Sequence, residues 1–240
     1  MKTSSKNTSL LWTGTISVLL LVVVSGNPVS TFSAYADPSS TQTRTCSGTP
    51  SPNTDWSNCD LSGVDLAFLN LSGVNLSGAN LQNTNLYDTN LSGANLVGAQ
   101  LAGANLNYVN LSGAKVNGIV AQNMDFYRSN LSGASFQGAN LQGSSFGMAN
   151  LQNTDFSGAN LSGIRAITAS FPGANLSNAD LTNSLLRASD FTGANLSNAD
   201  LQNAEFAYGI LAGANLAGAN VSNLATAQTD LSCHGSPICH

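Results

Sequence analysis

Charged side chains are scarce in this sequence. Asp, Glu, Lys and Arg supply 8% of the 240 residues, and 12 acidic residues outnumber 7 basic ones. A surface that binds nucleic acid needs clustered lysine and arginine to neutralise phosphates. We therefore expect no nucleic-acid partner. Disorder is not expected either, because 42% of the residues are hydrophobic and they stand at regular intervals.

Histidine is nearly absent as well. His234 and His240 both lie in the C-terminal tail, so no histidine is available to activate a serine in the long central region. The acidic residues are spread along the chain in positions that asparagine also fills, rather than paired as in a glycoside hydrolase. We expect no enzyme, including a hydrolase acting on a wall polymer, and no cofactor.

One long apolar run is present, close to the N-terminus. Lys2 and Lys6 precede it, its strongest part is residues 16–24, and the small-x-small pattern Ala-Tyr-Ala at 34–36 follows it. This order is typical of a secretory signal peptide. The alternative is a membrane anchor, for which the run is short. We predict a signal peptide at residues 1–36, no stable membrane anchor after its removal, and a mature chain with a net charge of −7.

A repeat of five residues fills the centre of the sequence. From Leu61 to Val221 every fifth residue is an anchor, and 29 of these 33 anchors are Leu or Phe. The residue two before the anchor is small, and is Ala in 17 units. A period of five fits neither a helix nor a flat strand. It fits a chain that turns a corner after each short strand, with the anchor and the small residue pointing inward.

Units such as Ala-Asn-Leu-Gln-Asn at 79–83 resemble the pentapeptide-repeat family, in particular its exported, cyanobacterial members. The resemblance implies an all-β fold, a right-handed quadrilateral parallel β-helix with four units per coil. The 33 units then make about eight coils. We divide the mature chain into an N-terminal tail and cap (37–58), the β-helix (59–223) and a C-terminal cap (224–240).

A second period, of 20 residues, separates the faces of the predicted coil. On three faces the last residue of the unit is Gly or Asn in all 25 units. On the fourth face the last residue of the unit is never Gly or Asn. That column reads Phe68, Asp88, Tyr108, Arg128, Met148, Thr168, Ala188, Tyr208 and Gln228. Gly and Asn favour turns with positive φ. We predict type II turns at three corners and a different turn, with negative φ, at the fourth.

We call this fourth side the Leu66 face. It consists of the outward positions of the unit anchored by Leu66 and of every fourth unit after it. It holds all tyrosines of the predicted mature chain and most of its arginines. Such residues are enriched in binding hot spots, and Arg128 lies within reach of a cation–π contact with Tyr108. The alternative is that these side chains only stack and stiffen the rod. The candidate interaction residues are Tyr87, Tyr108, Tyr127, Arg128, Arg165, Arg187 and Tyr208.

The four cysteines lie in two pairs, one near each end of the repeat. An exported chain favours disulfides, and a disulfide cannot join ends that lie about 40 Å apart. We therefore predict Cys46–Cys59 and Cys233–Cys239, with Trp56 covering the open end of the core. The two Cys-His pairs of the tail also allow a metal site with two sulfur and two imidazole ligands.

These features predict a non-enzymatic structural or protein-interaction module outside the cytoplasm, in the periplasm or the thylakoid lumen, with an unknown protein partner. The alternative that the resemblance implies is a family branch that mimics DNA and interacts with gyrase. Two features oppose it. Gyrase is cytoplasmic, and a rod of about 40 Å would need some two dozen negative charges to match DNA.

Overall fold

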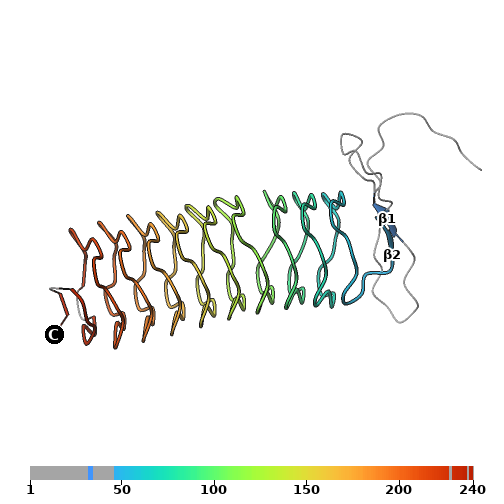
Figure 1. Ribbon diagram of the computed structural model, residues 1–240. Helices are drawn as coiled ribbons and strands as arrows, with labels where there is room; N and C mark the ends of the chain where they lie inside the picture. Colours follow the sequence, from blue (N-terminus) through green and yellow to red (C-terminus); the bar gives the residue numbers. More distant parts are fainter. Residues whose placement is uncertain (1–31, 35–45, 227–228, 237, 240) are drawn as a thin grey trace, which may run out of the picture.

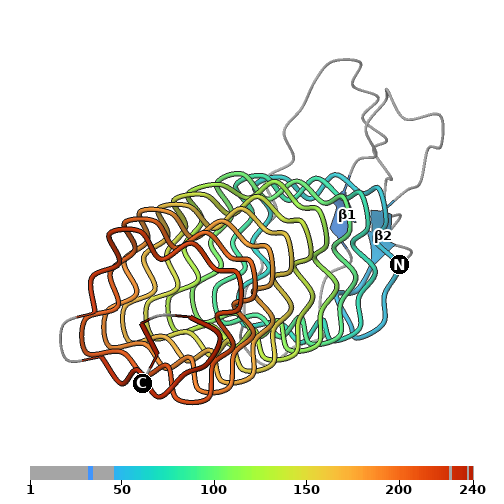
Figure 2. The same cartoon turned by 60° about the vertical axis from the view of Figure 1, so that its left-hand side comes forward.

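The computed structural model describes residues 32–34, 46–226, 229–236 and 238–239. Apart from residues 32–34, the predicted signal peptide lies outside the described residues. The two named strands, β1 (Phe32–Ala34) and β2 (Cys46–Gly48), pair antiparallel. From there the chain winds into a rod of stacked coils (Figures 1 and 2). No helix in the described part of the chain has the length and apolarity needed to cross a bilayer.

Single parallel bridges, rather than long strands, join the coils. The residue before the anchor pairs with its equivalent 20 residues further on, from Asp55–Asn75 to Ile210–Asp230, except at Gln100–Val120 and Asn105–Asp125. The anchor N–H donates to a carbonyl of the next coil, as from Leu61 N to Asn80 O at 2.8 Å. The pairing therefore repeats with the period of 20 that the sequence predicted. The last bridge, Asn215–His234, spans 19 residues.

The anchors fill the core as predicted. The Leu and Phe anchors from Leu61 to Leu216 are at most 2% exposed. Seven of them are phenylalanines whose rings contact one another along the rod, with centroids 4.4–6.5 Å apart: Phe126, Phe136, Phe146, Phe156, Phe171, Phe191 and Phe206. Because each coil packs on its neighbours, this core runs the length of the rod.

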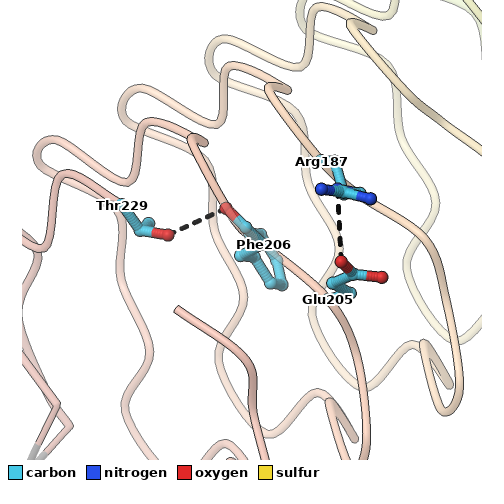
Figure 3. A network of polar contacts seen from close by, with 4 residues as sticks. All are labelled: Arg187, Glu205, Phe206 and Thr229. Atoms are coloured by element: carbon cyan, nitrogen blue, oxygen red, sulfur yellow. Dashed lines mark hydrogen bonds and ion pairs between the residues drawn. The ribbon is translucent and has the colours of Figure 1, made fainter. Parts of the chain in front are cut away.

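Polar side chains in the inward small position are satisfied by the backbone. Thr84 Oγ1 donates to the carbonyl of Leu61, and Thr229 Oγ1 to that of Phe206, each at 2.8 Å (Figure 3). These hydroxyls are stable in the core because each donates a hydrogen bond to an anchor carbonyl of the preceding coil.

Asparagines before the anchors form ladders on the outside of the rod. Asn90 Nδ2 donates to Asn70 Oδ1 at 3.0 Å, and Asn110 Nδ2 to Asn90 Oδ1 at 3.1 Å. Each amide oxygen also accepts the N–H two residues on, as Asn90 Oδ1 does from Ser92 at 3.1 Å. Asp can replace Asn in the acceptor role, which explains why the two residues alternate at this position.

The prediction of negative φ at the fourth corner is wrong. Phe68, Tyr108, Arg128 and Tyr208 have φ of 62°, 61°, 56° and 63°, close to the 67° of Gly63 on another face. The physical reason is the stacking hydrogen bond. The corner N–H donates to the next coil on the Leu66 face as elsewhere, so all four corners need the same left-handed geometry. The lack of Gly and Asn in this column is therefore not explained by the turn type.

At the N-terminal end, the five-residue pattern begins before the predicted boundary at residue 59. Asn53 has a positive φ. Trp56 takes an anchor position, and its backbone N–H donates a hydrogen bond to the carbonyl of Asn75 at 2.8 Å. Trp56 is 1% exposed and forms the first layer of the core. The predicted Cys46–Cys59 disulfide is present, with both sulfurs buried beside it.

At the C-terminal end, the predicted Cys233–Cys239 disulfide is also present. Because both sulfurs are bonded to each other, they are not available as thiolate ligands for the metal site that the sequence of the tail also allowed. His234 extends the ladder through its backbone, since its carbonyl accepts from Leu216 N at 2.8 Å.

Candidate functional site: an aromatic cluster on the Leu66 face

Four aromatic rings on the Leu66 face form a continuous line over the first coils. The ring centroids of Phe68 and Tyr87 are 5.4 Å apart, those of Tyr87 and Tyr108 5.2 Å, and those of Tyr108 and Tyr127 6.0 Å. Tyr87 and Tyr127 come from the position after the anchor, and Phe68 and Tyr108 from the corner. The line therefore zigzags between two columns.

Arg128 lies at the end of this line. Its guanidinium carbon is 5.4 Å from the centroid of Tyr127 and 6.0 Å from that of Tyr108, so the predicted cation–π contact is present. Electrostatic interaction with Tyr127, and then with Tyr108, raises the pKa of Arg128 above its usual value. The guanidinium therefore stays charged over the whole physiological range.

Met148 extends the cluster by one coil. Its Sδ lies 3.5 Å from Arg128 Nε and 3.6 Å from the hydroxyl of Tyr127, which both donate to it. We call Phe68, Tyr87, Tyr108, Tyr127, Arg128 and Met148 together the aromatic cluster. Phe68 is 67% exposed and Met148 52%, so large apolar surfaces face solvent at both ends of it.

The remaining candidates lie outside the aromatic cluster. Arg187 forms an ion pair with Glu205, with Nε and Oε1 3.2 Å apart (Figure 3). Arg165 and Tyr208 are exposed, and within the described residues they make no ion pair or ring contact with the other candidates. The structure thus brings Tyr87, Tyr108, Tyr127 and Arg128 together, and leaves Arg165, Arg187 and Tyr208 apart.

Two members of the aromatic cluster were missed as candidates. Phe68 and Met148 share the corner column with Tyr108 and Arg128, which was the available signal, but neither is tyrosine or arginine. An exposed phenylalanine and an exposed methionine are nonetheless typical of interfaces, where both residue types are enriched.

The backbone of this column is strained. All eight described corner residues of the Leu66 face have φ between 52° and 63° without being Gly or Asn. Such a conformation costs about 1–2 kcal/mol for a residue with a Cβ. At Tyr108 and Arg128 the ring and cation–π contacts offset part of this cost. Nothing in the structure explains alanine at 188.

The aromatic cluster presents ring faces, a guanidinium and a thioether, all of which can contact a partner. Within the described residues, no group of three or more His, Cys, Asp or Glu side chains is placed to hold a metal ion. Nearby carboxylates serve the fold: Asp65 Oδ1 accepts from Ala67 N at 3.1 Å and from Asn85 Nδ2 at 2.9 Å.

Comparison with known protein families gives a match over most of the chain. The family described as pentapeptide repeats matches with eight copies, over residues 52–83, 84–120, 110–147, 149–187 and 184–223. A comparison with curated protein sequences gives no significant match.

Several solved structures are similar to this chain. HetL, a pentapeptide repeat protein involved in heterocyst differentiation regulation from Nostoc sp. strain PCC 7120, is 28% identical, with 75% of this chain and 86% of HetL covered and a TM-score of 0.36. Rfr23 from Cyanothece 51142 is 25% identical over 50% and 86%, with a TM-score of 0.33. QnrB1, a plasmid-mediated fluoroquinolone resistance protein, is 17% identical over 69% and 88%, with a TM-score of 0.49.

The family match extends over far more than half of the sequence and over the whole regular part of the rod. Its boundaries agree with the backbone, since the match begins at residue 52 and the hydrogen-bonded coils at Asn53. The chain therefore belongs to the pentapeptide repeat family, whose members fold as right-handed quadrilateral β-helices.

Proposed function

We propose that this protein is an exported, non-enzymatic module that binds a protein partner through the aromatic cluster of the Leu66 face. Its rod of about eight coils, closed at each end by a disulfide-tied cap, positions that cluster. Members of the family are in general non-enzymatic structural or interaction proteins, which agrees with the scarcity of histidine.

The observation that carries the proposal is the arrangement of the aromatic cluster. Six residues that are enriched in interfaces, three of them tyrosines and one an arginine, form a chain of contacts on a surface made mostly of Ser, Asn, Gln and Gly. Rigid, clustered aromatic and arginine side chains are the usual centre of a binding hot spot. Four of the six, Phe68, Tyr108, Arg128 and Met148, stand at positive-φ corners, where Gly or Asn would be less strained.

Export is the second part of the proposal. It is supported by the basic and apolar N-terminal sequence, by the Ala-Tyr-Ala pattern at 34–36 and by two disulfides that suit an oxidising compartment. We propose the periplasm or the thylakoid lumen as the location. The DNA-mimicking alternative gains no support, since Arg128, Arg165 and Arg187 all lie on the face that carries the aromatic cluster.

The experiment combines fractionation with affinity capture from the native organism. The bait is the full chain, compared with a cluster-minus variant that carries Tyr87→Ser, Tyr108→Asn, Tyr127→Ser and Arg128→Asn. Asparagine is used at the two corners because it tolerates their positive φ. The matched control carries Gln142→Ser, Gln152→Ser and Gln202→Ser on other faces.

We expect the wild type and the control to capture the same partner, and the cluster-minus variant to lose it. Capture of the same partners by all three baits would contradict the binding role. Recovery of the native protein in the cytoplasm, with its N-terminus intact, would contradict export.

A further inference from the structure

The stacking of the coils is interrupted at one place within the rod. Between Leu61 and Leu216, all described residues, 30 of 32 anchor N–H groups donate to the next coil. The two exceptions are Leu101 and Leu106. In Figure 1 the coils in the green part of the rod stand visibly further apart than their neighbours.

Six neighbouring ladder bonds are missing along this line. The donors that would make them are Gly98, Leu101, Gly103 and Leu106 on one edge, and Val120 and Asp125 on the other. Within the described residues none of the six N–H groups donates to any protein group. The bridges that would join Gln100 to Val120 and Asn105 to Asp125 are missing too. We call this line between residues 98–106 and 117–125 the seam.

Normal hydrogen-bonded stacking resumes at both ends of the seam. On one side Leu96 N donates to Lys115 O at 2.8 Å, and on the other Tyr108 N donates to Tyr127 O at 2.9 Å. Coils beyond these points are stacked normally. The seam is therefore a local opening in a continuous rod, and it ends directly beside the aromatic cluster.

The sequence departs from the usual repeat along the opening. Ile119 and Met124 occupy inward positions that are usually Ala, Ser or Thr, and Ala121 occupies an anchor position that is usually Leu. The pairing of an inward isoleucine with an alanine anchor recurs at Ile164 and Ala166, where the coils stay stacked, so the inward Met124 is the departure that distinguishes the seam. The N–H of Met124 is turned away and donates to Ser144 Oγ in the following coil at 3.1 Å. This stretch was not singled out from the sequence, although three departures within six residues were visible.

The opening has an apolar mouth. A groove of about 340 Å³ is lined mainly by glycine and apolar residues from Gly98 to Ala102 and from Gly118 to Val120, with Gln82 and Gln100 as its polar members. Val120 is 66% exposed and nearby Val97 42%. Val120 stands where the ladder of asparagines would otherwise continue from Asn80 and Gln100 to Asn140.

We propose that the seam is a binding site for an extended polypeptide segment of a partner, which adds as a strand to the Leu101 edge. That edge carries four of the six free donors, together with the unused carbonyls of Ala99 and Ala104. Along the side that runs from the corner at Gly98 to the corner at Gly103, an extended peptide can pair with Ala99 O, Leu101 N and Gly103 N, and main-chain pairing of this kind is a recurrent recognition mode. A small apolar side chain of the segment packs against the exposed Val120.

The site is independent of the proposed function, because it uses no residue of the aromatic cluster. Its two parts can be tested in sequence on the full chain. The first measurement is hydrogen exchange of single amides by NMR. We expect the amides of Leu101, Gly103 and Val120 to exchange at least about 100-fold faster than those of Leu81, Asn83 and Asn140, which are bonded in intact coils.

The second measurement adds a peptide with the sequence of one side of the rod, acetyl-Gly-Ala-Asn-Leu-Ser-Gly-amide. We expect exchange at Leu101 and Gly103 to slow at least about tenfold at saturation, since both amides become bonded. The same peptide with an N-methylated leucine, which lacks one donor, should not have this effect.

Two variants and one control make the result specific. Val120→Lys places a charge at the mouth without touching the core, and should abolish binding while leaving the exposed amides fast. Ile119→Ala, Val120→Asn, Ala121→Leu and Met124→Ala together restore the usual repeat, and should close the seam and remove both effects. Asn140→Val, on the same face where the ladder is intact, should change neither.

Three results would overturn the proposal. The first is protection of Leu101, Gly103 and Val120 equal to that of Leu81 in the free chain, which would mean that the seam is closed. The second is fast exchange that the peptide leaves unchanged at millimolar concentration. The third is amide exchange that an apolar dye slows and the peptide does not, which would indicate a purely hydrophobic site.

Discussion

The two halves of the rod differ in where most of their aromatic side chains lie. Apart from Trp56 at the N-terminal end, the anchors up to Ala121 include no aromatic residue, and Phe68, Tyr87 and Tyr108 lie outside. From Phe126 onward seven anchors are phenylalanine. Phe126 and Tyr127 are adjacent in sequence, yet one is 1% exposed and the other belongs to the surface cluster.

This difference shows how the repeat separates stability from recognition. An aromatic residue at an anchor is buried and supports the fold, whereas one position further along it is available to a partner. The five-residue frame therefore allows the surface to change without altering the core. The same separation predicts that substitutions in the two halves will differ in kind as well as in size.

Removal of a core ring should have the largest effect. Phe146→Ala is expected to lower the free energy of unfolding by about 3–5 kcal/mol, because the ring is 1% exposed and stacked on Phe126 at 5.0 Å. Phe68→Ala, on a side chain that is 67% exposed, should cost less than about 1 kcal/mol. Chemical denaturation of both variants checks this, and equal losses would refute the division between the halves.

The two ends of the rod should respond differently to loss of their disulfides. Cys46–Cys59 joins residues 13 apart, and Cys233–Cys239 residues 6 apart. Chain-entropy arguments give about 3 kcal/mol for the first and about 2 kcal/mol for the second. Paired Cys→Ser substitutions, compared by thermal unfolding, measure how much each disulfide stabilises the fold. A larger loss of stability at the C-terminal end would show that packing, rather than loop closure, determines these contributions.

The strained column offers a smaller effect of opposite sign. Ala188→Gly should raise the free energy of unfolding by about 1 kcal/mol, since alanine at φ 53° is strained and glycine is not. The matched control is Gly193→Ala on another face, where φ is 64° and an added Cβ would meet nothing within 4 Å. It should lower stability by a similar amount. If Ala188→Gly destabilises the rod, the strain argument fails.

The smallest predicted effect is on pH dependence. Burial alone would raise the pKa of Asp155, but hydrogen bonds from Ser157, Gln137 and Asn175 outweigh it and hold that pKa below its ordinary value. The ionised form is therefore favoured in the folded state. Its contribution to stability is present above the unfolded pKa and is lost as the pH falls through the folded one.

Asp155→Asn should accordingly reduce stability slightly at neutral pH, and the difference from the wild type should shrink as the solution is acidified below about pH 4. Thermal unfolding at a series of pH values measures this. A difference that grows on acidification would mean that the carboxylate is not favoured in the fold.

Much of this architecture could be predicted from the sequence, because the repeat has no insertions and each position has one physical role. The inward anchors, the period of 20 and both disulfide pairs follow from that regularity. The φ of the fourth corner could not be predicted from composition. Glycine is only a preference at positive φ, and the stacking bonds impose that geometry on Tyr108 and Thr168 as well.

The aromatic cluster was predicted only in part. Sorting by 20 placed Tyr87, Tyr108, Tyr127 and Arg128 on one face, but contacts depend on side-chain reach, which the pattern does not give. Met148 joins the cluster because its sulfur accepts from Arg128 and Tyr127, whereas Arg187 turns to Glu205. The seam depends on the volumes of several residues in neighbouring coils, so no single position reveals it.

The most direct test of the binding role is the stability of the cluster-minus variant, measured by chemical denaturation on the same preparation used for partner capture. If the aromatic cluster serves recognition, the variant loses its partner while its free energy of unfolding changes by less than about 1 kcal/mol, because relief of strain at two corners offsets the lost ring contacts. A loss of about 3 kcal/mol or more, with partner capture unchanged, would show instead that the cluster stiffens the rod.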